Sequence, residues 1–169
     1  MSNADRAEII ASVCDTLSAD GTDRARRLIA EQYPHRPVVA AGHRYSKAQC
    51  VAVYLRDGYT DRYSGQRLVF PGTLRLLSLL LPDALPFHRN WKMSACHPMY
   101  WDLCPTIDHV VPVARGGLDE EANWVSTSML RNAAKANWTL DELGWQLCPP
   151  GHRDGWDGLT GWCLASIHR

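Results

Sequence analysis

The fold of this chain is decided by one stretch of its sequence, Pro105-Thr106-Ile107-Asp108-His109-Val110-Val111-Pro112. β-Branched residues are frequent in it and favour extended backbone, so we expect a strand over residues 106–113. An acidic residue stands directly before a histidine within this run, at Asp108 and His109. The stretch therefore predicts a strand that carries two chemically active side chains.

The segments that follow predict three further elements. Arg115-Gly116-Gly117 is a turn signal, and Trp124-Val125 begins a second short strand. One of the hydroxyl residues at 126–128 is then a suitable N-cap for a helix that continues through Ala136. The region 105–136 is thus expected to fold as strand, glycine turn, strand and helix.

Four polar side chains of this region suit metal-assisted cleavage of a phosphodiester. That reaction needs an activated water, neutralisation of the charge on the phosphorane and stabilisation of the leaving oxygen. The Asp108 carboxylate and the Asn132 amide oxygen are hard ligands for a divalent cation. Because histidine titrates near neutrality, His109 can take a proton from water. Asn123 can orient the histidine ring by a hydrogen bond from the facing loop.

Strand geometry places one condition on such a site. Alternation along a strand points Asp108 and His109 to opposite faces, so a twist or bend at this pair is required for both to reach one phosphate. Lys135 lies three residues beyond Asn132, on the same helix face, and is a candidate contact for the scissile phosphate. Further candidates for substrate binding are Arg62, Arg115 and Arg131.

Each of these residues also has an ordinary structural interpretation. An Asp-His pair is often a polar strand terminus, Asn123 can cap a turn, and Asn132 can be an exposed helix residue. Their joint occurrence, in the expected order of elements, favours the functional interpretation.

Residues 105–136 resemble the ββα-metal core of HNH endonucleases, in the HNN variant where asparagine replaces the last histidine. They are also similar to the HNH domain of RNA-guided CRISPR effectors. The resemblance implies that His109 is the general base and that Asp108 and Asn132 hold one divalent cation, Mg²⁺ or alternatively Mn²⁺. It further implies that Asn123 positions the base and that the substrate is DNA, cut to leave 5′-phosphate ends.

The resemblance extends upstream to residues 56–68, which look like the opening segment of bacterial HNH proteins. Many members carry a C-x-x-C pair there and a second pair beside the catalytic helix, which together bind a structural zinc. Here Tyr63-Ser64-Gly65 stands at the first place, with Ser128 and Arg131 at the second, so no structural zinc is expected. We expect the motif to be stabilised by hydrophobic packing instead, through Trp101, Trp124 and Trp138.

Six cysteines are scattered along the chain without any C-x-x-C pair. Buried, reduced thiols are the ordinary expectation for an intracellular protein of this size. A zinc site remains an alternative, because thiolates and imidazole bind zinc together. Its ligands would be Cys96, Cys104, Cys148 and His152.

Formal charge is zero overall but is unevenly distributed. Residues 1–23 carry a net charge of −4, residues 24–75 carry +7, and residues 76–169 carry −3. The middle segment can supply phosphate contacts, or its charges can be ordinary solvated helix faces. The sequence does not decide between these two interpretations.

Taken together, the patterns predict an α+β, mostly helical single domain built around a small ββα-metal motif. Residues 1–45 are expected to form an N-terminal helical extension, and residues 46–169 the endonuclease domain. The expected elements besides the motif are helices over 4–18, 23–32, 46–56, 74–81, 98–103 and 156–168, a short helix after Thr139, and a strand over 67–70.

The chain shows no apolar run of membrane-spanning length and no signal-peptide pattern at its start, so a cytoplasmic protein without membrane contact is expected. DNA is the expected partner, with RNA as an alternative substrate and a partner protein as a possible source of specificity. A non-cleaving module that binds nucleic acid or protein on an HNH scaffold is the competing hypothesis. Neither the oligomeric state nor the sequence specificity follows from these residues.

Overall fold

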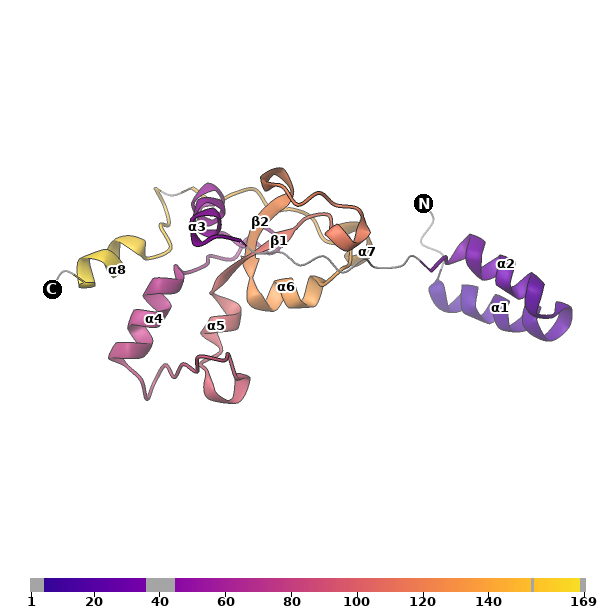
Figure 1. The fold of residues 1–169 in the computed structure, drawn as a ribbon, viewed down its shortest axis with the longest axis horizontal. Helices are drawn as coiled ribbons and strands as arrows, with labels where there is room; N and C mark the ends of the chain where they lie inside the picture. Colours follow the sequence, from indigo (N-terminus) through magenta and orange to yellow (C-terminus); the bar gives the residue numbers. More distant parts are fainter. Residues whose placement is uncertain (1–4, 36–44, 153, 168–169) are drawn as a thin grey trace. The chain divides into compact units, whose positions relative to one another are not determined.

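A computed structural model describes residues 5–35, 45–152 and 154–167 of the chain. These residues form eight α-helices and one two-stranded antiparallel sheet, which confirms the expected α+β, mostly helical class (Figure 1). The chain divides into two compact units, residues 1–38 and 39–169. The expected boundary at residue 45 adjoins residues 36–44, which lie outside the described part.

The first unit is a pair of packed helices, α1 (Arg6–Asp20) and α2 (Thr22–Gln32). Asp5 caps α1, because its side chain accepts a hydrogen bond from the Ala7 amide at 2.9 Å. Gly21 joins the helices with a φ of +83°, a backbone conformation that favours glycine. The helix expected over 4–18 is therefore present, although its expected start at residue 4 lies outside the described residues.

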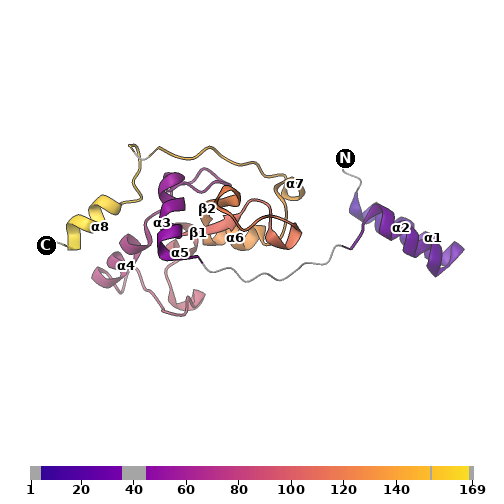
Figure 2. The same ribbon diagram turned by 45° about the horizontal axis from the view of Figure 1, so that its top comes forward.

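The second unit is centred on a hairpin of β1 (Pro105–His109) and β2 (Trp124–Ser128). The strands pair antiparallel, with His109 opposite Trp124 and Ile107 opposite Ser126. Helices α3 (Lys47–Arg56) and α6 (Met129–Lys135) both pack on the hairpin, which lies between them in both views of the ribbon (Figures 1 and 2).

Capping residues fix where the helices around the hairpin begin. Ser46 starts α3 through a capping box with Gln49, and Ser128 starts α6 by accepting from the Arg131 amide at 3.2 Å. Thr139 begins α7 in the same way, as its sequence predicted. The remaining helices are α4 (Pro71–Leu80), α5 (Met99–Asp102), α7 (Leu140–Leu143) and α8 (Thr160–Ile167).

Two hydrophobic clusters support this unit. One joins α3 to the hairpin and is built from Val53, Tyr54, Tyr59, Leu68, Ile107 and Trp124. The other lies around α4 and α5 and is built from Val69, Leu74, Cys96, Met99, Tyr100 and Cys104.

Four expected elements are wrong in extent, one of them the closing helix expected over 156–168, which begins only at Thr160. The strand expected over 67–70 is reduced to a single bridge between Thr60 and Arg67, because the amides of Val69 and Phe70 donate to loop carbonyls instead. Helix α4 begins at Pro71 rather than near 74, since proline suits the first turn of a helix. Strand β1 ends at His109, four residues before the expected end.

Two buried carboxylates bind the free edge of β2. Asp57 Oδ2 accepts from the Ser126 amide at 2.7 Å, and Asp61 Oδ2 accepts from the Ser128 amide at 2.9 Å. Both aspartates are fully buried. The loop between α3 and residue 65 thus takes the place of a third strand. Its aspartate side chains accept hydrogen bonds from the edge amides of β2, which would otherwise be buried without a partner.

This aspartate pair partly corrects the expectation that packing by Trp101, Trp124 and Trp138 stabilises the motif in place of a zinc ion. Trp124 does pack in the core beneath the hairpin. Trp101 packs against the other cluster, however, and Trp138 is 40% exposed. Polar bonds from the upstream loop, rather than a set of three indoles, join that loop to the hairpin.

None of the helices in the described part of the chain is long and apolar enough to cross a membrane.

Candidate functional site at the end of the first strand

The carboxylate of Asp108 lies on the α6 side of the hairpin and is held by two buried donors. Its Oδ2 accepts from the Tyr63 hydroxyl at 2.6 Å and forms an ion pair with Lys135 Nζ at 2.9 Å. Burial, followed by the charge of Asp108, raises the pKa of Tyr63 well above its usual range, so this hydroxyl keeps its proton and donates. The site therefore holds the Asp108 carboxylate in place with one oxygen fully engaged.

Asn132 reaches the same strand from α6. Its Nδ2 donates to the Ile107 carbonyl at 3.2 Å, which turns its Oδ1 away from that carbonyl. Among the described residues, neither this oxygen nor Asp108 Oδ1 has a hydrogen-bond partner, and neither is sealed from solvent. Two hard oxygen acceptors thus remain available, one on β1 and one on α6, and a carboxylate and an amide oxygen are the kind of ligand that fits a divalent cation.

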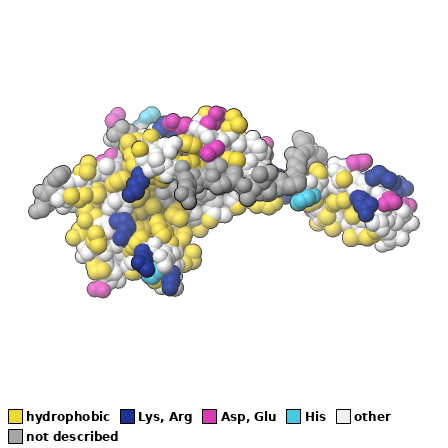
Figure 3. Space-filling model, in the orientation of Figure 1, with side chains coloured by type: hydrophobic (Ala, Val, Ile, Leu, Met, Phe, Trp, Pro, Cys, Tyr) yellow, Lys and Arg dark blue, Asp and Glu magenta, His cyan; other side chains and the backbone are white. Residues whose placement is uncertain are grey.

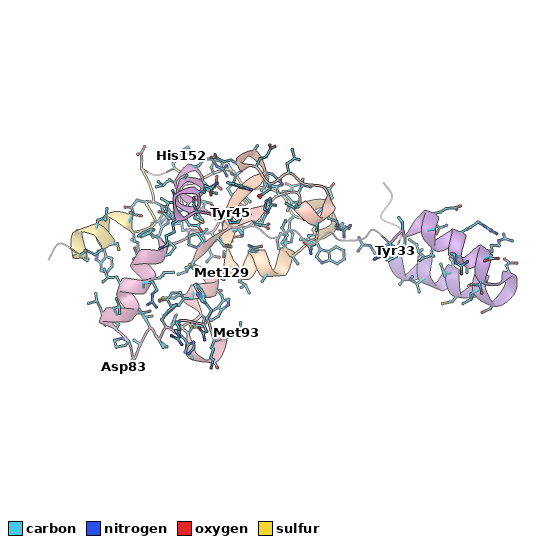
Figure 4. The ribbon with its side chains drawn as sticks, viewed as in Figure 1. Tyr33, Tyr45, Asp83, Met93, Met129 and His152 are labelled. Carbon is cyan, nitrogen blue, oxygen red and sulfur yellow. The ribbon has the colours of Figure 1, made fainter. Side chains whose placement is uncertain are left out.

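His109 points to the opposite face of β1, as strand alternation predicted. Its Nε2 lies 2.8 Å from Asp119 Oδ1 and 3.2 Å from the indole nitrogen of Trp124. The Tyr45 hydroxyl lies 3.3 Å from Nδ1; Figure 4 labels this tyrosine beside the hairpin. Asp108 and His109 occupy the last two positions of β1, so both side chains flank the point where the strand ends.

Asn123 does not bind the His109 ring directly, which corrects the expected contact. Its Oδ1 accepts from the Val111 amide at 2.9 Å, while its Nδ2 donates to the carbonyls of Val111 and Leu118, both at 2.8 Å. The amide therefore closes the loop between the two strands. The backbone groups of this loop satisfy both the oxygen and the nitrogen of the Asn123 amide, whereas a single ring nitrogen of His109 could bind only one of them.

The candidate phosphate ligands are placed differently from the expectation. Lys135 is fully buried, and its Nζ donates to the His109 carbonyl at 2.7 Å in addition to pairing with Asp108. Arg62 is also internal, because it donates to the Cys148 carbonyl at 2.6 Å and to Asp57 at 3.2 Å. Both side chains therefore bind other groups of the protein in this arrangement.

The other two arginines lie against tryptophan rings. The guanidinium of Arg131 lies 5.3 Å from the centre of the Trp145 ring, and that of Arg115 lies 5.9 Å from Trp138. Arg115 also approaches Glu142 at 3.6 Å. On the face shown in Figure 3, the described basic side chains stand in separate spots among hydrophobic ones.

Sequence reasoning missed three residues that contact the site: Tyr45, Tyr63 and Asp119. Asp119 begins an acidic run of three residues after the glycine turn, a pattern typical of a solvated loop. The two tyrosines carry no local signal, since they reach the hairpin from segments 45 or more residues away.

Three tyrosines with raised pKa values make the fold sensitive to alkali. Burial and the charges of Asp119 and Asp108 raise the pKa of Tyr45 from 10.0 to about 12. Burial raises the pKa of Tyr54 and Tyr63 further. Unfolded tyrosines lose their protons near pH 10 while these folded ones retain them, so the unfolded state gains relative stability as pH rises.

We therefore expect the melting temperature to be steady below about pH 9 and to fall by about 5 °C or more toward pH 11. Melts followed by circular dichroism measure this. Tyr45→Phe should make the fall at alkaline pH shallower, because Tyr54 and Tyr63 still contribute, whereas Tyr33→Phe, at an exposed position, should leave it unchanged. A melting temperature that stays constant through pH 11 would contradict the raised pKa values of these tyrosines.

The alternative zinc site is not assembled. Cys96, Cys104, Cys148 and His152 all belong to the described part of the chain. Within that part, no group of three or more His, Cys, Asp and Glu side chains is placed to hold a metal ion. Cys96 and Cys104 instead pack in the second core cluster, where burial raises the pKa of the Cys104 thiol to about 12.

Comparison with known proteins yields no relative: no protein-family model, curated protein or solved structure matches this chain.

Proposed function

We propose that this chain is a metal-dependent HNH-type endonuclease that hydrolyses phosphodiester bonds of DNA, with His109 as the general base. One observation carries the proposal. On one face of the end of β1, the Asp108 carboxylate and the Asn132 amide each keep one oxygen without a partner among the described residues. On the other face, the Asp119 carboxylate holds the His109 ring. A phosphate lying across the end of the strand would have both sets of groups beside it.

The residues of this chain divide the work as follows. His109 takes a proton from the attacking water, and Asp108 and Asn132 are the groups that would hold a divalent cation. Such a cation, when bound, neutralises charge on the phosphate and stabilises the leaving oxygen. Lys135 and Tyr63 hold the Asp108 carboxylate in place, so its second oxygen keeps a fixed direction.

The test is a series of metals and nucleic acids. End-labelled duplex DNA, single-stranded DNA and RNA are incubated with purified protein and Mg²⁺, Mn²⁺ or excess chelator. We expect cleavage of duplex DNA that needs the metal and stops with chelator. Metal-dependent cleavage confined to RNA would replace the substrate but keep the chemistry. Cleavage that persists in chelator would exclude the proposed role of Asp108 and Asn132.

The Lys135 ion pair favours a second candidate function, a binding module that does not cut. The ammonium already neutralises Asp108, which weakens the attraction of that carboxylate for a divalent cation. Under this second proposal the same DNA would be retained in a gel-shift assay at low salt, but no metal in the series would produce cleavage. The two functions are therefore distinguished by the same set of samples.

A further inference from the structure

We propose that Asp119 is the positioning residue of His109: it fixes the ring and holds its single proton on Nε2, which leaves Nδ1 as the nitrogen that accepts a proton. The assignment of a base rests on the proposed nuclease function. The assignment of the tautomer rests on the local geometry alone.

The side chains of His109 and Trp124 both face one oxygen of Asp119. Asp119 Oδ1 lies 2.8 Å from His109 Nε2 and 3.1 Å from the indole nitrogen of Trp124. The indole nitrogen always carries its hydrogen, and an ionised carboxylate can only accept. If Nε2 carries the proton, one carboxylate oxygen accepts from both rings. If Nε2 carries a lone pair instead, that lone pair faces the carboxylate oxygen at 2.8 Å and the two repel. The Trp124 N–H also lies 3.2 Å from Nε2, but it has the carboxylate oxygen at 3.1 Å as its other acceptor, so the first arrangement is favoured.

The Tyr45 hydroxyl is compatible with this choice. It lies 3.3 Å from Nδ1 and 3.4 Å from Nε2, so it can donate to whichever nitrogen carries the lone pair. The Asp119 carboxylate, 2.8 Å from Nε2, therefore decides the tautomer, and the hydroxyl then donates toward Nδ1.

The loop that carries Asp119 is itself held in place. Asn123 donates to the carbonyl of Leu118, the residue directly before Asp119, and binds both polar backbone groups of Val111. Gly117 lies so close to the Val111 carbonyl that any Cβ there would overlap it. Asn123 thus positions the histidine through Asp119 rather than by touching the ring.

The exposure of Asp119 fits a positioning role better than a role in folding. Its side chain is 47% exposed, whereas the His109 side chain is 9% exposed. A carboxylate in that position gives up little hydration, and replacing it leaves no buried cavity. Variants at position 119 are therefore expected to fold.

The first measurement is the tautomer of His109 in ¹⁵N-labelled protein, read from long-range proton–nitrogen couplings in alkaline buffer, where the ring is neutral. The His109→Ala spectrum identifies the resonances. The wild type should show the Nε2-protonated form. Asp119→Ala should shift the ring toward the Nδ1-protonated form, because the Trp124 N–H then donates to Nε2. Asp119→Asn retains an acceptor and should keep the wild-type tautomer, as should the neighbouring control Glu120→Ala.

The second measurement is cleavage by the same variants. Asp119→Ala should lower kcat by about 100-fold with little change in KM, a loss typical of removing the orienting partner of a functional histidine. Asp119→Asn should recover part of that loss, and Glu120→Ala should match the wild type. A tautomer that does not respond to Asp119→Ala overturns the positioning role, whatever the activity. A tautomer that shifts while kcat is unchanged overturns its catalytic importance. If the tautomer shifts and even the wild type cuts nothing, the positioning stands and the nuclease proposal fails.

Discussion

Replacing His109 with alanine should lower the rate of DNA cleavage by about 10³-fold, within the range of about 10²–10⁴ that general bases contribute. The reason is that the neighbouring carboxylates have other roles in the proposal: Asp108 is a metal ligand held by Tyr63 and Lys135, and Asp119 binds His109 and Trp124. Single-turnover kinetics on duplex DNA with saturating Mg²⁺ measures the effect.

The matched control for this variant is His152→Ala. His152 is exposed in the loop after α7 and is labelled in Figure 4. It should cut at the wild-type rate. Circular dichroism and DNA retention should be unchanged for both variants, so that a loss of cleavage reports chemistry rather than folding. A His109→Ala protein that keeps more than about a tenth of the wild-type rate would show that another group activates the water.

Replacing Asp57 with alanine should have the largest effect on stability, a loss of about 3–5 kcal/mol in the free energy of unfolding. The substitution leaves the buried Ser126 amide without its acceptor and separates Arg56 and Arg62 from their shared carboxylate. Since domains of this size are stable by only about 5–15 kcal/mol, the variant would be close to unfolding. Urea denaturation followed by tryptophan fluorescence measures the change.

Two further variants keep this prediction testable if alanine prevents folding. Asp57→Asn retains an acceptor for the Ser126 amide but loses the charge, so an intermediate loss is expected. Asp83→Ala removes a carboxylate at the exposed tip after α4 and should lie within about 0.5 kcal/mol of the wild type (Figure 4). Asp57→Ala within about 1 kcal/mol of the wild type would refute the role of the aspartates at the edge of β2.

Local patterns were sufficient for the hairpin and the helix that follows it. β-Branched residues, a glycine turn and the Ser128 cap act over a few residues, so their effect can be read from the sequence. The same is true of the capping boxes at Ser46 and Thr139. The failure at 67–70 has a tertiary cause, because loops near Leu103 and Gly158 take the amide donors that a strand partner would have taken.

The residues of the candidate site also differ in whether local sequence patterns could predict their places. Asp108, His109 and Asn132 could be predicted because their spacing places them around one hairpin. The burial of Lys135 could not, since a lysine near the end of a short helix ordinarily reaches solvent, whereas here the Asp108 carboxylate compensates its charge inside the protein. The contact between Asp119 and His109 depends on how Asn123 closes the intervening loop, which no local pattern specifies.

The proposed nuclease activity is decided by the rate at which supercoiled plasmid is nicked by wild-type and His109→Ala protein purified side by side, in Mg²⁺ with and without chelator. We expect open-circular product from the wild type in Mg²⁺ alone, with ends that a DNA ligase can seal. We expect no product from either protein in chelator and almost none from His109→Ala. Equal nicking by the two proteins, or no nicking by the wild type with any divalent cation, would refute the proposal that His109 activates water for DNA cleavage.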